Sequence, residues 1–272
     1  MGTLENHTLL YDKDCPLCKV YTSGFIKTDM LDANGRKPFC NIPGQENYID
    51  LKRATNGIAL ADTKNKTVVY GMDSSLKVIG NSFPIVGKTG NLRPIKFLLG
   101  KTCSFISYNR KVIMPGRQSG EKAFDCVPGF NYGYSLAYIV LAGFITTIVL
   151  FVFSGLLHGL PESTIQGESI LALGQILFQV LFLMGKTRRA IIGYIGNLMT
   201  VSLMGPLLLI PVVLLGLLID VHQGVILGWL GLTVSIMFIG HSRRVKALGL
   251  PSYLSYTWMV YRVVALIIIL NV

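Results

Sequence analysis

Two cysteines near the start of the chain have the spacing of a thiol pair that performs redox chemistry. The chain reads HTLLYDKDCPLC from His7 to Cys18, so an apolar run that predicts a strand precedes both cysteines. Pro16 fits the first turn of a helix, so Cys15 would cap that helix, where unpaired backbone N–H groups and the helix dipole favour a thiolate. Cys18 follows one turn later on the same face. We therefore predict that Cys15 is the catalytic nucleophile and that Cys18 resolves the mixed disulfide.

The neighbouring carboxylates and the remaining cysteines leave the role of the pair open. Nearby carboxylates disfavour a thiolate, so Asp12 and Asp14 oppose the ionisation of Cys15. They would instead support the site as proton acceptors or bind a cation. A zinc site needs two further ligands, yet Cys40, Cys103 and Cys126 form no second close pair, and we expect neither a metal nor a cofactor. The same spacing would also suit a structural disulfide, or a pair without any chemistry. The three scattered cysteines are interpreted as small apolar residues, and Cys126 also as a candidate redox partner.

The surrounding pattern predicts a small α/β domain that positions the pair. Apolar runs separated by turn residues predict strands over 9–12, 38–42, 58–62 and 67–70. Helices are predicted over 16–30, 47–54, 74–79 and 94–108. The last helix is amphipathic, and its core candidates are Phe97, Leu98, Phe105 and Ile106.

The composition divides the chain into two parts. Hydrophobic residues make up 51% of the chain and charged residues only 14%, but 18 of the 25 basic and 11 of the 14 acidic residues precede Tyr134. We predict a charged domain over 1–114, a linker over 115–133 and a helical transmembrane domain over 134–272. The basic residues form no dense run with interleaved aromatics, so the lipid bilayer is an expected partner and nucleic acid is not.

Apolar segments after Asp125 predict four or five membrane crossings, since a bilayer core of about 30 Å requires roughly 20 helical residues. The segment 169–185 is near the lower limit of length, and 190–219 is long enough to be one tilted helix with a kink at Pro206 and Pro211. The segment 254–270 either crosses the membrane or lies flat on it. The predicted crossings are 134–157, 169–185, 190–219, 221–242 and, as the fifth, 254–270.

The loops between these segments predict the orientation. Basic residues gather over 186–189 and 243–246, in loops that lie two crossings apart, whereas the alternating loops contain Glu162, Glu168 and Asp220 without any Lys or Arg. The basic loops should face the cytoplasm. We therefore expect an integral membrane protein of a bacterial inner (plasma) membrane, with its N-terminal domain in the reducing cytoplasm, where a structural disulfide is disfavoured.

Arg262 is a strong charge inside an apolar segment. Such a charge costs about 2.5 to 3.5 kcal/mol at the centre of a bilayer on insertion scales. It either belongs to a buried site that faces Asp220, a substrate or another subunit, or it extends to the inner interface. We treat Arg262 as a candidate functional residue within the membrane.

Around the cysteine pair the chain resembles the DCC (DUF393) family of thiol-disulfide oxidoreductases, which is named for an Asp-Cys-Cys motif. The similar segments are YDKDCPLC from Tyr11, VVYGMD from Val68 and ISYNR from Ile106, within about residues 8 to 115. The resemblance implies a thioredoxin-like fold fused to membrane helices. Asn109 and Arg110 then either line the active cleft, where Arg110 would support a thiolate, or cap a helix and pair with carboxylates.

One feature departs from the thioredoxin pattern. Thioredoxins place a cis-proline beside the cysteine pair, whereas Asn56 and Gly57 precede the predicted strand that begins at Ile58. Three functions stay open, and the third would make the helices a transporter of electrons or thiols across the membrane, although no cysteine follows Cys126. The first is a membrane-anchored thiol-disulfide oxidoreductase with an unidentified protein thiol or disulfide partner. The second is a non-enzymatic membrane subunit or scaffold of a larger membrane complex, with a thioredoxin-like docking head.

Overall fold

The computed structural model describes residues 2–13, 15–39, 48–115, 129–158, 161 and 163–271. The predicted site residue Asp14, the cysteines Cys40 and Cys126, and Glu162 lie outside the described residues. The chain forms two compact units, Met1–Tyr134 and Ser135–Val272, and each is described by itself.

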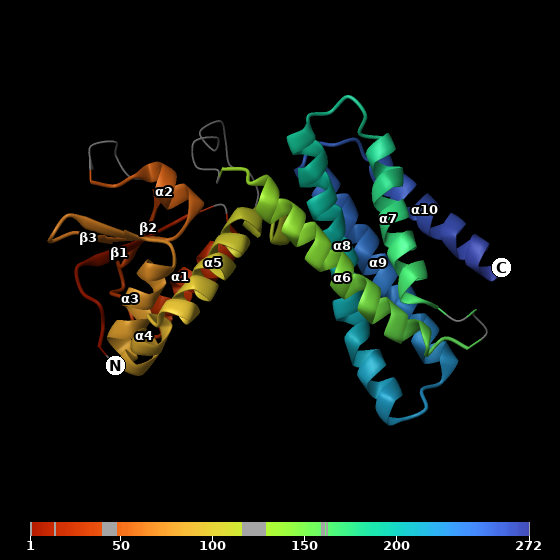
Figure 1. Cartoon of the computed structure of the whole chain (residues 1–272), viewed down its shortest axis with the longest axis horizontal. Coiled ribbons are helices and arrows are strands. Elements are labelled where there is room, and N and C mark those ends of the chain that lie inside the picture. Colours follow the sequence, from red (N-terminus) through yellow and green to blue (C-terminus); the bar gives the residue numbers. More distant parts are fainter. Residues whose placement is uncertain are drawn as a thin grey trace. The chain divides into compact units, whose positions relative to one another are not determined.

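The first unit contains a mixed sheet of four strands (Figure 1). The strand order is β2-β1-β3-β4, with β1 and β2 parallel and the other neighbours antiparallel. These directions confirm the predicted β/α domain, and they are compatible with the thioredoxin-like fold that the family resemblance implies. The strands are β1 (His7–Tyr11), β2 (Arg36–Pro38), β3 (Ala59–Asp62) and β4 (Thr67–Tyr70).

Helices cover both faces of this sheet. Successive residues of a strand point to opposite faces, so Leu9 packs in a cluster with Val78 of α3, and Leu10 packs in a cluster with Ala54 of α2. Figure 1 shows α2 on one side of the sheet and α1 and α3 on the other. The helices are α1 (Pro16–Lys27), α2 (Leu51–Asn56), α3 (Met72–Ser82), α4 (Pro84–Gly90) and α5 (Arg93–Ile113).

Three expectations for this unit differ from the structure. The second strand begins earlier than predicted, because Arg36–Pro38 is the segment that pairs in parallel with β1. Helix α4 was not predicted, since glycines such as those in this segment are typical of turns. A Cβ at Gly87 would lie 2.7 Å from the Gly80 Cα, so glycine at this position permits α3 and α4 to cross closely. The prediction that Phe97, Leu98 and Ile106 are core residues is wrong, because these residues are 68%, 66% and 39% exposed.

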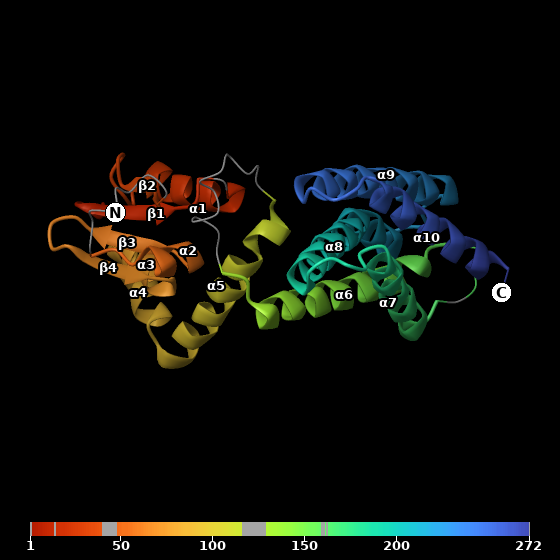
Figure 2. The same cartoon turned by 90° about the horizontal axis from the view of Figure 1, so that it is seen from above.

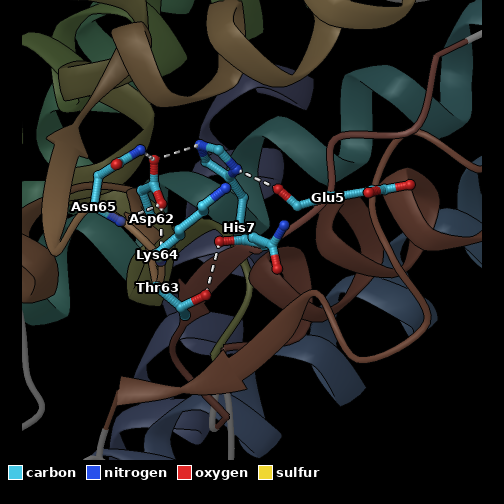
Figure 3. Close-up of polar contacts among 7 residues, drawn as sticks. Glu5, His7, Asp62, Thr63, Lys64 and Asn65 are labelled. Carbon is cyan, nitrogen blue, oxygen red and sulfur yellow. Dashed lines mark hydrogen bonds and ion pairs between the residues drawn. The ribbon is translucent and has the colours of Figure 1, made fainter.

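The turn between β3 and β4 is stabilised by Asp62 (Figure 3). Its carboxylate accepts hydrogen bonds from the Asn65 backbone at 2.9 Å, from the Asn65 amide at 2.8 Å and from the Lys64 backbone at 3.0 Å. His7 Nε2 of β1 lies 3.6 Å from the same carboxylate. These donors, led by the backbone and side chain of Asn65, lower the pKa of Asp62 to about 2. The contacts hold the hairpin in register with β1.

The second unit is helical. Four of its helices, α6, α8, α9 and α10, are long and apolar enough to cross a membrane, whereas α7 is apolar but has only 17 residues. The predicted helical domain with candidate membrane spans is confirmed, and α7, whose segment was predicted to be near the lower limit of length, is its shortest helix. The helices are α6 (Tyr132–Ser154), α7 (Ile165–Leu181), α8 (Arg188–Leu218), α9 (Gln223–Ala247) and α10 (Tyr253–Leu270).

Buried polar side chains connect these helices in the helical unit. Helices α8 and α9 pack against each other (Figures 1 and 2), and both predicted kink prolines lie inside α8. Tyr194 of α8 donates a hydrogen bond to Gln179 Oε1 of α7 at 2.8 Å and lies 3.1 Å from His241 Nε2 of α9. His241 Nδ1 lies 3.1 Å from Ser255 Oγ of α10. The network satisfies polar groups that are removed from water.

Candidate functional site

The two N-terminal cysteines lie at the point where β1 leads into α1. Cys15 has an extended backbone and is the N-cap of α1, and Pro16 occupies the first turn of the helix. The Cys15 N–H donates to the Asp12 carbonyl at 3.2 Å, which holds the turn between the strand and the helix. This local geometry follows from the sequence, because proline lacks the N–H that the first helical turn would leave unpaired.

The geometry of the pair divides the two thiols into different roles. Cys15 Sγ accepts a hydrogen bond from the Cys18 backbone N–H at 3.3 Å. The Cys18 thiol also donates to Cys15, and this bond is the main reason why the pKa of Cys15 falls from 9.0 to about 7. Burial and the negative charge of Asp12 raise the pKa of Cys15, whereas the Cys18 N–H and the positive charge of Arg110 lower it. Donation to Cys15 and burial raise the pKa of Cys18. Cys15 is therefore the better thiolate, and Cys18 is held as a thiol.

A buried ion pair lies beside the cysteines. Arg110 Nη2 of α5 donates to Asp12 Oδ2 at 2.9 Å, and both side chains are buried. The two residues are 98 positions apart in the chain. Asp12 compensates the arginine charge, while the arginine lowers the pKa of both thiols. The pair thus connects α5 to the turn that carries Cys15.

A cavity of about 320 Å³ opens beside Cys18. Cys18, Cys103 and Arg110 line it, whereas Cys15 is not among its described lining residues. Gly57 and Ile58, which lead into β3, also lie on its wall. The rest of the wall is predominantly apolar and includes Leu17, Tyr21, Met72, Leu99 and Ile106. Such a space accommodates an apolar group next to the Cys18 thiol.

The remaining predicted site residues lie in different places. Asn109 does not point toward the cysteines, because its Nδ2 donates to the carbonyls of Phe105 at 2.9 Å and Tyr134 at 3.0 Å. Asp14 lies outside the described residues, and Arg262 belongs to the helical unit. The structure therefore brings together Asp12, Cys15, Pro16, Cys18 and Arg110.

Two further residues of the site were missed by sequence reasoning. Tyr21 makes a side-chain hydrogen bond with Cys18, and burial raises the pKa of Tyr21. Cys103 lines the same cavity, and burial raises its thiol pKa. Helical spacing contained a signal for both, since Tyr21 follows Cys18 by one turn and Cys103 precedes Arg110 by two turns.

Known proteins give no further identification of the site. Protein-family models, curated proteins and solved structures were compared with the chain, and no significant match was found. Within the described ranges, no group of three or more His, Cys, Asp or Glu side chains could hold a metal ion. Fold and site together define a β/α domain with a close Cys15–Cys18 pair at a helix start, followed by a helical region with four candidate membrane spans.

Proposed function

We propose that the chain is a membrane-anchored thiol-disulfide oxidoreductase of the DCC (DUF393) type. The observation that carries the proposal is the hydrogen bonding of Cys15 at the start of α1, which brings its pKa to about 7. A thiol with that pKa is about half ionised at neutral pH, and the thiolate is the nucleophile in disulfide exchange. The similarity of three segments to the DCC family supports the same activity.

The proposed reaction reduces a disulfide in a partner protein. The Cys15 thiolate attacks one partner sulfur and forms a mixed disulfide, and the other partner sulfur leaves and takes up a proton. Cys18 then gives up its proton and attacks Cys15 Sγ, so that the Cys15–Cys18 disulfide forms and the second partner sulfur leaves as a thiol. The partner gains two electrons and two protons. A dithiol reductant returns the electrons and protons to the cysteine pair.

Arg110 and the apolar cavity support this proposal in different ways. The arginine charge opposes the high pKa of Cys18 and so helps that thiol to ionise for the second step. The cavity would receive an apolar side chain next to the partner disulfide. Cys15 and Cys18 are each only 3% exposed, so the surrounding chain must move before a protein disulfide can reach Cys15. We therefore expect exchange to be slow with small soluble disulfides and faster with a matching protein partner.

The membrane helices would anchor this head to a bacterial inner membrane. The basic residues around Lys186 and at the C-terminal end of α9, which was predicted to be a loop over 243–246, support a cytoplasmic location of the N-terminal domain, since positively charged segments beside membrane helices remain on that side. In that compartment glutathione and thioredoxin systems keep thiols reduced. The proposed direction of catalysis is therefore disulfide reduction.

The test uses the full chain in detergent micelles. Equilibration with dithiol buffers of graded potential, followed by alkylation and mass shift, should reveal a two-electron couple that requires both Cys15 and Cys18. Cys18→Ser should accumulate a mixed disulfide with the partner, whereas Cys103→Ser should leave the couple intact. A pair that forms no reversible disulfide at any accessible potential would refute the proposal. That result, with function unchanged in Cys15→Ala, would favour the non-enzymatic membrane subunit.

A further inference from the structure

Arg262 carries a charge in the middle of α10 without an ion-pair partner among the described residues. Among the residues that the structure describes, no carboxylate lies within ion-pair distance of its guanidinium, and the predicted partner Asp220 makes no contact with it. Glu168 acts on it only through a longer-range electrostatic interaction. The nearest described partner is the ring of Trp258, whose centre lies 5.6 Å from the guanidinium carbon.

The arginine lines a cavity of about 110 Å³ inside the helical unit. Helices α6, α8, α9 and α10 all contribute to its wall, and most of that wall is aliphatic. No Asp, Glu or His is among the described residues that line it. Its polar lining residues are Thr146, Ser202, Thr233, Trp258 and Arg262.

Several buried donors of this cavity have no hydrogen-bond partner. Trp258 is 1% exposed and Thr146 is 3% exposed, yet Trp258 Nε1 and Thr146 Oγ1 bond to nothing in the described part of the chain. Arg262 Nε is likewise buried without a partner among those residues. An indole N–H and a guanidinium only donate hydrogen bonds, and a hydroxyl can donate one. The cavity therefore collects donors and one positive charge, and its described wall contains no negative charge.

We infer that this cavity binds a small monovalent anion, either a halide or a short carboxylate. Such an anion would accept hydrogen bonds from Arg262 Nε, Trp258 Nε1 and Thr146 Oγ1, which buried polar groups require. It would also neutralise a charge that is costly in an apolar bundle. The volume exceeds the roughly 30 Å³ that one water molecule occupies in the liquid, so chloride or acetate fits. A large anion such as gluconate does not.

The fluorescence of Trp258 provides a direct assay. The chain has two tryptophans, so Trp229→Phe makes Trp258 the sole reporter in the full-length protein. Chloride or acetate is titrated against gluconate at constant ionic strength in detergent micelles. A saturable change with chloride and acetate, and none with gluconate alone, is expected. A response that is absent, linear or equal for all three anions would overturn the inference.

Matched variants identify the arginine as the binding group. Arg262→Gln should weaken anion binding by about tenfold to a hundredfold, because it removes the positively charged donor that lines the cavity. Arg243→Gln removes an exposed arginine of α9 and should leave the affinity unchanged. Retention of wild-type affinity in Arg262→Gln would show that the cavity is not the site.

A milder change keeps the inference testable if Arg262→Gln does not fold. Thr146→Val removes one hydroxyl at nearly constant volume and should weaken binding by about tenfold, as expected for one lost hydrogen bond. Chloride should raise the melting temperature of the Trp229→Phe parent more than that of the Thr146→Val variant, since a ligand stabilises the folded state that it binds. Equal shifts in both proteins would contradict the assignment. Cys15→Ser should retain the full anion response, so failure of the redox proposal would not affect this site.

Discussion

Replacing Cys18 by alanine should return the pKa of Cys15 toward its ordinary value. The shift from 9.0 to about 7 corresponds to roughly 3 kcal/mol of preferential stabilisation of the thiolate, at about 1.4 kcal/mol for each pKa unit. The Cys18 thiol is the largest contributor, while its backbone N–H remains in Cys18→Ala. We therefore expect the pKa of Cys15 to rise by about one unit or more, so that the thiolate fraction at pH 7 falls from about one half to about one tenth.

The assay is the pH dependence of Cys15 alkylation in a chain whose Cys40, Cys103 and Cys126 are replaced by alanine. The midpoint of the profile is the informative quantity, because a thiolate of higher pKa is also more nucleophilic and partly offsets the loss of ionised thiol in a single rate. Cys18→Ser is the matched control, since its hydroxyl can still donate to Cys15 Sγ. Its midpoint should stay nearer to that of the cysteine parent.

The result that would refute this reasoning is a midpoint near pH 7 in Cys18→Ala. In that case the Cys18 side chain would not be the main cause of the low pKa, and the helix start and Arg110 would have to account for it. A midpoint that rises equally in Cys18→Ala and Cys18→Ser would show that hydrogen-bond donation is not the relevant property.

Three further predictions concern stability. Arg110→Met removes the charged partner of the buried Asp12 carboxylate, so the free energy of unfolding of the head should fall by about 3 to 5 kcal/mol, and an added Asp12→Asn should restore part of the loss. Full stability in the single variant would contradict the buried ion pair. Gly87→Ala should destabilise the head, because the added Cβ would meet the backbone of Gly80. Gly24→Ala in α1 should stabilise the head by about 0.5 to 1 kcal/mol, because the added Cβ meets nothing within 4 Å. Thermal unfolding should therefore show a lower melting temperature for the first variant and a higher one for the second. The Asp62 carboxyl should titrate near pH 2 when followed by NMR. The stability that its hydrogen bonds contribute is fully present above pH 3.8 and should be lost as the pH falls through about 2. A titration midpoint near 3.8 would show that the hydrogen-bond donors do not lower the pKa of Asp62.

Local signals were sufficient to predict much of the first unit. Proline at the first helical position and a cysteine before it define the start of α1, and the structure has the same cap. The predicted hairpin is present as β3 and β4, because apolar runs separated by turn residues define it within a short stretch of chain. The membrane helices were also predictable, since apolar length alone decides whether a segment can span a bilayer.

Long-range packing decided what the sequence left open. Arg110 was predicted either to line the cleft or to pair with a carboxylate, and the structure has it lining the cavity while it pairs with Asp12. Asn109, its neighbour, points elsewhere, because adjacent residues of a helix lie about 100° apart around its axis. Amphipathic spacing alone could not show that Phe97 and Leu98 are exposed, since it identifies an apolar face without showing what covers that face.

The sequence by itself determined the two-part chain, the cysteine pair at a helix start and the apolar helices, because each depends on residues close together along the chain. Only the tertiary structure decided that Arg110 lies against Asp12 beside the thiols, and that Thr146, Trp258 and Arg262 meet in one cavity. Those contacts join parts of the chain that are distant in sequence. Their formation depends on how side chains of different elements fill space and satisfy buried polar groups, which no local pattern encodes.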